Sequence, residues 1–149
     1  MDHIKTTADG RLWISNINSI TRRAFRKHEI DYNLNLSFKP IDDRRRISGT
    51  TYEQIAFKDA TAGEDIHTQY NEAVTTTVQR IRETDDRIVV NCGAGVSRSA
   101  AVTATAIAVI EEISFQEALE HVSDARASVN PYDAFREYGT VYAADRVDS

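Results

Sequence analysis

The sequence predicts an α/β fold in which helices pack against a mainly parallel sheet. Segments with strand character alternate with segments of helical character along the chain, and this alternation is typical of parallel strands joined by helical crossovers. The helix expected over 98–112 is apolar on nearly all sides, as is usual for a helix packed on both sides. The 149 residues are enough for one domain, 1–149, with a single substantial core.

Four segments have the character of strands. The first alternates loosely, and the second places an apolar residue at every second position, which is the period of a strand. The fourth, with the sequence IVVN, begins with three β-branched residues and indicates a buried strand. In chain order, the expected strands are 12–17, 30–36, 51–57 and 88–91.

Helices are expected between and after these strands, and all but the one over 98–112 have a recognisable start signal. The expected ranges are 21–28, 66–83, 98–112 and 115–127, with a final helix near the C-terminus. The start signals are Ser19 or Thr21 as an N-cap, Glu64 with Asp65 before the second helix, a capping box over 114–117, and Pro131 in the first turn of the final helix.

The stretch VVNCGAGVSRSA (89–100) is the most informative part of the chain. Cys92 follows the buried strand, and Arg98 comes six residues later, where a helix begins. Small residues between them let the backbone turn tightly, so that its N–H groups converge on one point and form an anion nest. Arg98 adds a planar fork for two oxygens of a phosphate, and the same positive field favours the thiolate form of Cys92. The expected phosphate-binding residues are Gly93, Ala94, Gly95, Val96, Ser97 and Arg98.

An alternative interpretation is a buried structural cysteine beside an ordinary strand-to-helix turn. The spacing of Cys92 and Arg98 is weak evidence on its own. An ordinary turn, however, has no need for an arginine at the start of a helix, where the helix dipole disfavours a cation. The strand, loop and helix together therefore favour a phosphate cradle with a nucleophile at its base.

The run CGAGVSRSA (92–100) resembles the signature loop of the dual-specificity protein phosphatases, within the protein-tyrosine-phosphatase superfamily. The resemblance implies a three-layer α/β fold of the phosphotyrosine protein phosphatase type, with a mainly parallel central sheet flanked by helices. One position departs from the family, which usually places a histidine immediately before the cysteine, where this chain has Asn91. Further similar segments are 11–17, 30–37, 52–59 and 129–138.

The resemblance implies a cysteine-dependent protein phosphatase. The expected reaction is the hydrolysis of phosphotyrosine through a phosphocysteine intermediate. The resemblance leaves open whether phosphoserine and phosphothreonine are also substrates. Cys92 is the expected nucleophile, Arg98 holds the phosphate oxygens, and Ser99 resembles the hydroxyl that stabilises the departing thiolate. The alternative is a non-catalytic phosphate-binding module, a pseudophosphatase, in which Asn91 marks lost chemistry.

A general acid must deliver a proton to the leaving oxygen, and Asp59 is the expected donor. It follows the third strand and enters a loop at about the separation from the cysteine that the family shows. Glu64 and Asp65 are the rivals, although their usual role is that of carboxylates at a helix N-terminus. Arg126 is expected to bind substrate or to be a solvated arginine at a helix end. The arginines at 44–46 would contact a phosphorylated partner, or, more commonly for such a run, lie in a solvated loop.

Composition indicates which compartment, partners and cofactors to expect. A single cysteine excludes an internal disulfide and fits a reducing cytoplasm. The net charge of −5 argues against a nucleic-acid partner, and the apolar run 100–110 is too short to span a bilayer. The four histidines lack metal-ligand spacing, so no metal and no cofactor is expected. The expected partner is a phosphorylated protein or peptide, and the sequence indicates no particular oligomeric state.

Overall fold

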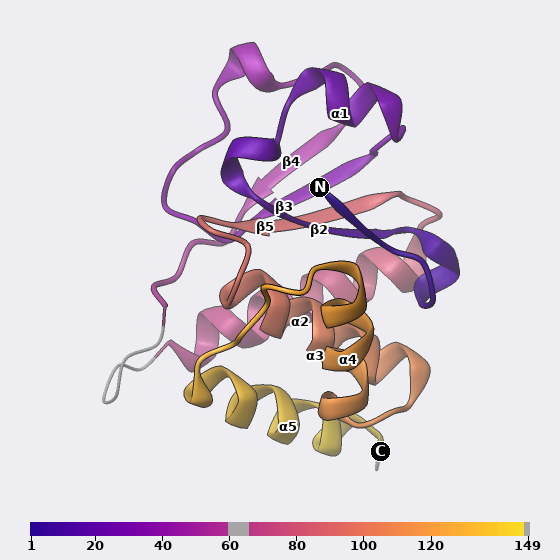
Figure 1. The fold of residues 1–149 in the computed structure, drawn as a ribbon, viewed down its shortest axis with the longest axis vertical. Helices are drawn as coiled ribbons and strands as arrows, with labels where there is room; N and C mark the ends of the chain where they lie inside the picture. Colours follow the sequence, from indigo (N-terminus) through magenta and orange to yellow (C-terminus); the bar gives the residue numbers. More distant parts are fainter. Residues whose placement is uncertain (60–65, 148–149) are drawn as a thin grey trace.

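The computed structural model describes residues 1–59 and 66–147, arranged as a central sheet between two unequal helical layers (Figure 1). The strands are β1 (Asp2–Ile4), β2 (Leu12–Asn16), β3 (Tyr32–Asn35), β4 (Thr51–Gln54) and β5 (Ile88–Cys92). The helices are α1 (Arg22–Lys27), α2 (His67–Glu83), α3 (Arg98–Glu111), α4 (Phe115–Ala125) and α5 (Asp133–Val147). Short 3-10 helices are η1 (Ala8–Gly10), η2 (Ile17–Ser19) and η3 (Asp43–Arg45).

The sheet has the strand order β1-β2-β5-β3-β4, in which β2, β5, β3 and β4 are parallel and β1 is antiparallel to β2. This confirms the predicted three-layer α/β fold with a mainly parallel sheet. Because the parallel strands run in one direction, their carboxyl ends meet at one edge of the sheet. Cys92 ends β5 at this edge, with Asn16 of β2 as its neighbour in the ladder. Sites of α/β folds usually lie at such an edge.

Several helix ends differ from the predicted ones. Helix α4 ends at Ala125, before the predicted 127, because the backbone of Arg126 is already extended. Of the two predicted caps of α1, Thr21 is the one that accepts the N–H of Ala24. The final helix begins at Asp133, so Pro131 is not in its first turn. The expected start signal of α2 at Glu64 and Asp65 lies outside the described residues.

Two apolar clusters hold the layers together. On the face of the sheet covered by α1, the cluster includes Trp13, Phe25 and Val89. On the other face, α3 lies among α2, α4 and α5, and its residues from Ser99 to Val109 are all buried. The prediction of a helix packed on both sides is therefore confirmed. This packing fixes the start of α3 directly after the loop that follows β5.

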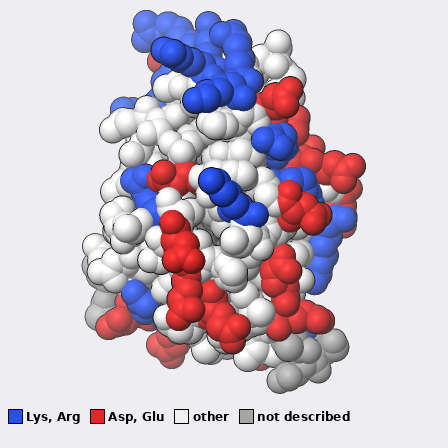
Figure 2. Space-filling view, turned by 45° about the vertical axis from the view of Figure 1, so that its right-hand side comes forward, with Lys and Arg blue, Asp and Glu red and all other residues white. Residues whose placement is uncertain are grey.

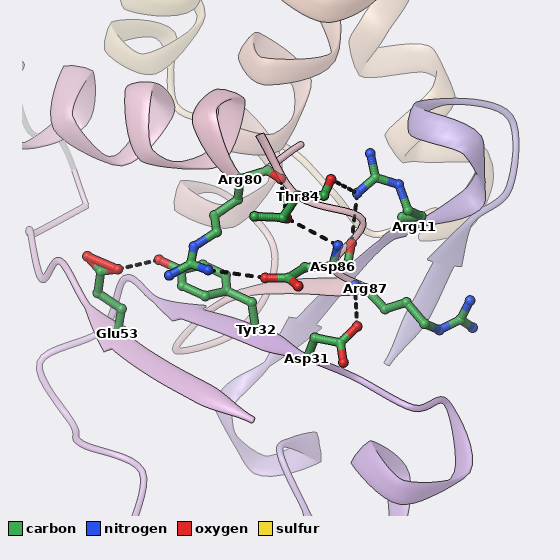
Figure 3. A network of polar contacts seen from close by, with 8 residues as sticks. All are labelled: Arg11, Asp31, Tyr32, Glu53, Arg80, Thr84, Asp86 and Arg87. Atoms are coloured by element: carbon green, nitrogen blue, oxygen red, sulfur yellow. Dashed lines mark hydrogen bonds and ion pairs between the residues drawn. The ribbon is translucent and has the colours of Figure 1, made fainter. Parts of the chain in front are cut away.

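A polar network fixes the opposite edge of the sheet, where β5 begins (Figure 3). The guanidinium of Arg80 lies over the ring of Tyr32 at 4.2 Å and pairs with Asp86 at 3.1 Å. The Tyr32 hydroxyl donates to Glu53 at 2.6 Å. Burial, and to a smaller extent this hydrogen bond, raise the pKa of Tyr32. Arg11 donates to the carbonyl of Asp86. The network ties α2 to β3, β4 and the turn into β5, far along the strands from Cys92.

Candidate active site

The carbonyls of five consecutive loop residues, 93–97, all point away from the centre of the loop, because each accepts a hydrogen bond from outside it. Their donors are Ile17 N for Gly93, Arg126 Nη2 for Ala94, Arg126 Nε for Gly95, Asn130 N for Val96 and Ala101 N for Ser97, at 2.8–3.1 Å. In a trans peptide the N–H points opposite to the C=O, so the N–H groups of residues 94–98 turn inward. The loop therefore has the geometry of an anion nest.

Gly95 permits this turn in two ways. Its φ is +72°, a region that residues with a side chain rarely adopt. A Cβ at this position would lie 2.8 Å from Asn16 N and from Ser15 C, both backbone atoms of β2. The loop therefore packs directly on the carboxyl end of β2, with no room for a side chain.

Cys92 lies at the base of the loop and is only 2% exposed. Its Sγ is 3.2 Å from the Ser99 hydroxyl and accepts the N–H of Gly95 at 3.3 Å. Both groups can donate to a negatively charged sulfur, and such donors stabilise a thiolate. Cys92 and Ser99 thus meet as the sequence analysis expected.

Arg98 and Asp59 also meet at this site. Arg98 Nη1 donates to the carbonyl of Phe57 at 2.9 Å and lies 3.4 Å from that of Leu36. Its Nε is 3.5 Å from Asp59 Oδ1, which makes an ion pair rather than a hydrogen bond. The Arg98 side chain is 13% exposed and that of Asp59 is 39% exposed. Asp59 can therefore reach the site from the segment after β4, whereas its rivals at 64 and 65 lie outside the described residues.

Arg126 contacts the backbone carbonyls of the loop. Its Nε and Nη2 donate to the carbonyls of Gly95 and Ala94, and its Nη1 pairs with Asp2 Oδ2 at 2.7 Å. All three guanidinium nitrogens therefore have partners within the protein. The structure gives Arg126 the role of holding the loop, which sequence reasoning missed because its partner Asp2 lies on the unpredicted strand β1.

Asn91 takes part in a buried polar network on the face of the sheet opposite to the Cys92 side chain. Its Oδ1 accepts from Asn33 Nδ2 at 2.9 Å, and its Nδ2 donates to Asn35 Oδ1 at 3.0 Å. All three asparagines are buried. Because neighbouring residues of a strand point to opposite faces, the Asn91 side chain faces away from the Cys92 sulfur. The departure from the family at position 91 therefore changes contacts with β3.

The arginines at 44–46 lie mostly against the protein's own backbone and rings. Arg45 donates to the carbonyl of Ile17, and the guanidinium of Arg46 lies 5.2 Å from the centre of the Tyr52 ring. Arg44 is exposed. Figure 2 shows lysine and arginine gathered at the upper end of the molecule, where α1 and η3 lie, and acidic residues predominating below. The run thus belongs to a basic end of the molecule.

The described residues include no group of three or more His, Cys, Asp or Glu side chains placed to hold a metal ion. Among the same residues, none of the helices has the length and apolarity needed to cross a membrane. The chemistry available at this site is that of Cys92, Ser99, Arg98, Asp59 and the loop amides.

Comparisons with known proteins agree with this geometry. Residues 12–142 match the family described as dual specificity phosphatase, catalytic domain. Dual specificity protein phosphatase 19 of Mus musculus is 30% identical over 117 residues, which are 78% of this chain and 51% of that protein. The chain thus spans about half the length of this curated relative.

Solved structures share the fold. Human DUSP28 superimposes with a TM-score of 0.80 at 19% identity, over 96% of this chain and 99% of that chain. The human tyrosine phosphatase-like serine/threonine/tyrosine-interacting protein superimposes with a TM-score of 0.72 at 19% identity, over 90% of this chain and 91% of that chain. The family model matches most of this chain, and the mouse relative shares 30% of its residues over the matched region. This chain therefore belongs to the dual-specificity phosphatase family of the protein-tyrosine-phosphatase superfamily.

Proposed function

We propose that this chain is an active protein phosphatase that hydrolyses phosphotyrosine, with phosphoserine and phosphothreonine as further substrates, through a phosphocysteine at Cys92. The observation that supports this most is the loop itself. Its five carbonyls all face outward, so its N–H groups face the centre of the loop, and that of Gly95 donates to the sulfur that would attack. A buried cysteine in an ordinary turn needs no such arrangement.

In the first step, the Cys92 thiolate attacks phosphorus and the bond from phosphorus to the ester oxygen breaks. The inward N–H groups and the Arg98 guanidinium hold the three remaining phosphate oxygens as charge develops on them. Asp59, as the protonated acid, delivers its proton to the departing oxygen. The dephosphorylated side chain then leaves with a neutral hydroxyl.

In the second step, water attacks the phosphocysteine and the sulfur leaves as a thiolate. Asp59, now a carboxylate, takes the proton of the water. The Ser99 hydroxyl, 3.2 Å from the sulfur, donates to the thiolate as it forms. Inorganic phosphate leaves, and both Cys92 and Asp59 return to their starting forms.

The pair of Arg98 and Asp59 gives substrate binding a further consequence. A phosphate dianion between the loop amides and Arg98 competes with the Asp59 carboxylate for the same guanidinium. Binding thereby releases the Asp59 carboxylate from Arg98, and the released carboxylate takes up from solvent the proton that it then delivers to the departing oxygen. The proposed reaction needs the single cysteine as a free thiol, which a reducing compartment preserves. We therefore propose that the protein lies in the cytoplasm.

The competing function is a non-catalytic phosphate-binding module. The fold alone does not decide between the two, because it is shared with a protein described as phosphatase-like. The position of Asn91 favours catalysis, since its side chain bonds to β3 and leaves the donors around the sulfur in place.

Turnover of p-nitrophenyl phosphate by the wild type and by Cys92→Ser tests the proposal. We expect turnover by the wild type and none by Cys92→Ser, while both bind tungstate, an oxyanion similar to phosphate, because serine keeps the shape of the site without a thiolate. Tungstate binding without turnover in the wild type would instead identify a binding module. Turnover that survives in Cys92→Ser would rule out the cysteine mechanism.

A further inference from the structure

We infer that Asp2, on the N-terminal strand β1, is a positioning residue that acts through Arg126 on the peptide bond whose N–H points at Cys92. The inference goes beyond the proposed function, on which it rests for the role of the sulfur. It adds a residue far from the loop in sequence to the machinery that shapes the loop.

Three contacts in series connect Asp2 to the sulfur. Asp2 Oδ2 pairs with Arg126 Nη1 at 2.7 Å, and Arg126 Nη2 donates to the carbonyl of Ala94 at 3.1 Å. That carbonyl and the N–H of Gly95 belong to one planar peptide unit. The same N–H donates to Cys92 Sγ at 3.3 Å. Turning this peptide would therefore remove a donor from the sulfur.

Arg126 acts on this peptide unit by both orientation and polarisation. Its hydrogen bond holds the Ala94 carbonyl outward and so keeps the Gly95 N–H inward. A cationic donor on a carbonyl also polarises the amide, which strengthens the N–H as a donor. The second bond, from Arg126 Nε to Gly95 O at 2.9 Å, fixes the next peptide in the same sense. The Arg126 side chain thus fixes the orientation of two adjacent peptide units of the loop.

Asp2 orients Arg126 because it takes the third guanidinium nitrogen. The side chains of Asp2 and Arg126 are 35% and 19% exposed, so the pair is partly shielded from water. A charge-assisted bond of 2.7 Å is among the shorter and stronger hydrogen bonds of proteins. Without the carboxylate, the guanidinium can turn toward solvent or toward a bound phosphate and leave the loop carbonyls.

The topology explains why the beginning of the chain reaches the loop. Since β1 is antiparallel to β2, its first residues lie toward the carboxyl edge of the parallel strands, where Cys92 is. Asp2 is paired with Ile14 in the ladder, and Ile4 is fully buried. The position of Asp2 is therefore fixed by strand pairing and by the core.

The test compares Asp2→Asn with Asp2→Glu and with the control Asp9→Asn, which removes one carboxylate from the same end of the chain at an exposed position on η1. The readouts are the pH dependence of Cys92 alkylation by iodoacetate and the affinity for tungstate, neither of which needs turnover. In Asp2→Asn we expect alkylation near neutral pH to slow and tungstate binding to weaken, each by about tenfold, the usual size for a hydrogen bond to a charged group. Asp2→Glu should recover most of both, and Asp9→Asn should match the wild type.

A double-mutant cycle with Arg126→Gln decides whether Asp2 acts through the arginine. If it does, Asp2→Asn changes neither readout further once Arg126 is replaced. Independent, additive losses would overturn the inference, as would an Asp2→Asn variant that only unfolds at a lower temperature while both readouts stay at wild-type values. If the wild type turned over no substrate while Asp2→Asn still slowed alkylation and weakened tungstate binding as expected, the proposed function would be wrong and this inference would stand.

Discussion

Gly95 is the residue at which the loop and the sheet constrain each other most. Gly95→Ala should abolish tungstate binding and turnover, because the new Cβ would meet backbone atoms of β2 at 2.8 Å and the φ of +72° is strained for alanine. Gly49→Ala is the matched control, since Gly49 has a φ of +90° but a Cβ added there would meet no atom within 4 Å. The control should cost only the strain of the left-handed region, about 1 kcal/mol, in thermal unfolding. Comparable tungstate binding in the two variants would contradict the close packing of the loop on β2.

Asp59 is the residue whose assigned role depends most on substrate chemistry. Asp59→Asn should lower turnover of esters with poor leaving groups by about 10²-fold, within the usual range for acid catalysis. The loss should shrink for an activated aryl phosphate, whose leaving group needs no proton. The alkaline limb of the pH–rate profile should also disappear, because it reports deprotonation of the acid. An unchanged profile in Asp59→Asn, together with its loss in Asp65→Asn, would transfer the role to Asp65.

At the scale of elements, the buried asparagines join β3 to β5. Asn91→Ala should lower the free energy of unfolding by about 1–3 kcal/mol, because it removes one hydrogen bond each from the buried amides of Asn33 and Asn35. Because the Asn91 side chain faces away from the sulfur, the pH dependence of Cys92 alkylation should stay as in the wild type. Chemical denaturation and iodoacetate kinetics on the same two proteins check both halves. A shifted alkylation profile without loss of stability would mean that position 91 acts on the thiolate.

The elements that the sequence could predict are those with a strong local signal. The strand, loop and helix around Cys92 follow from an apolar run, glycines and a small-residue helix, and Asp59 follows from its place after the third strand. By contrast, β1 has only three residues and no periodicity to detect. Its absence from the prediction also hid Asp2 and therefore the role of Arg126.

The alternation over 30–36 predicts a strand but not the burial of its polar positions. Its polar positions 33 and 35 are typical of the solvated side of a strand, but both asparagines are buried. Each of them hydrogen-bonds to Asn91 of the neighbouring strand β5, a compensation that only the assembled sheet provides. Burial of matched polar groups leaves no hydropathy signal in a single sequence.

At the scale of the whole molecule, charge is distributed unevenly, with a basic end over α1 and η3 (Figure 2). His28 caps α1 at this end. Its pKa is lowered by burial and then by Lys27, His3, the N-terminal ammonium and Arg87. A folded state that disfavours protonation binds fewer protons than the unfolded chain, so stability is lost as pH falls from about 6.5, the ordinary histidine value.

His28→Gln should therefore flatten the pH dependence of stability. Between about pH 7 and pH 5, the unfolding temperature of the wild type should fall further than that of His28→Gln. Above that range, the unfolding temperatures of the two proteins should change with pH to a similar extent. Thermal unfolding followed by circular dichroism at several pH values is the measurement. A parallel fall in both proteins would show that the basic end does not act through His28.

The central claim, that Cys92 is the nucleophile of a working phosphatase, is tested most directly by trapping the intermediate. Acid quenching of Ser99→Ala during turnover of a phosphotyrosine peptide, followed by mass spectrometry of the fragment that contains Cys92, measures the phosphocysteine. Because Ser99→Ala removes a donor to the departing thiolate, the account predicts one phosphate on Cys92, at higher occupancy than in the wild type. Continued release of phosphate with an unmodified Cys92 in both proteins would contradict it.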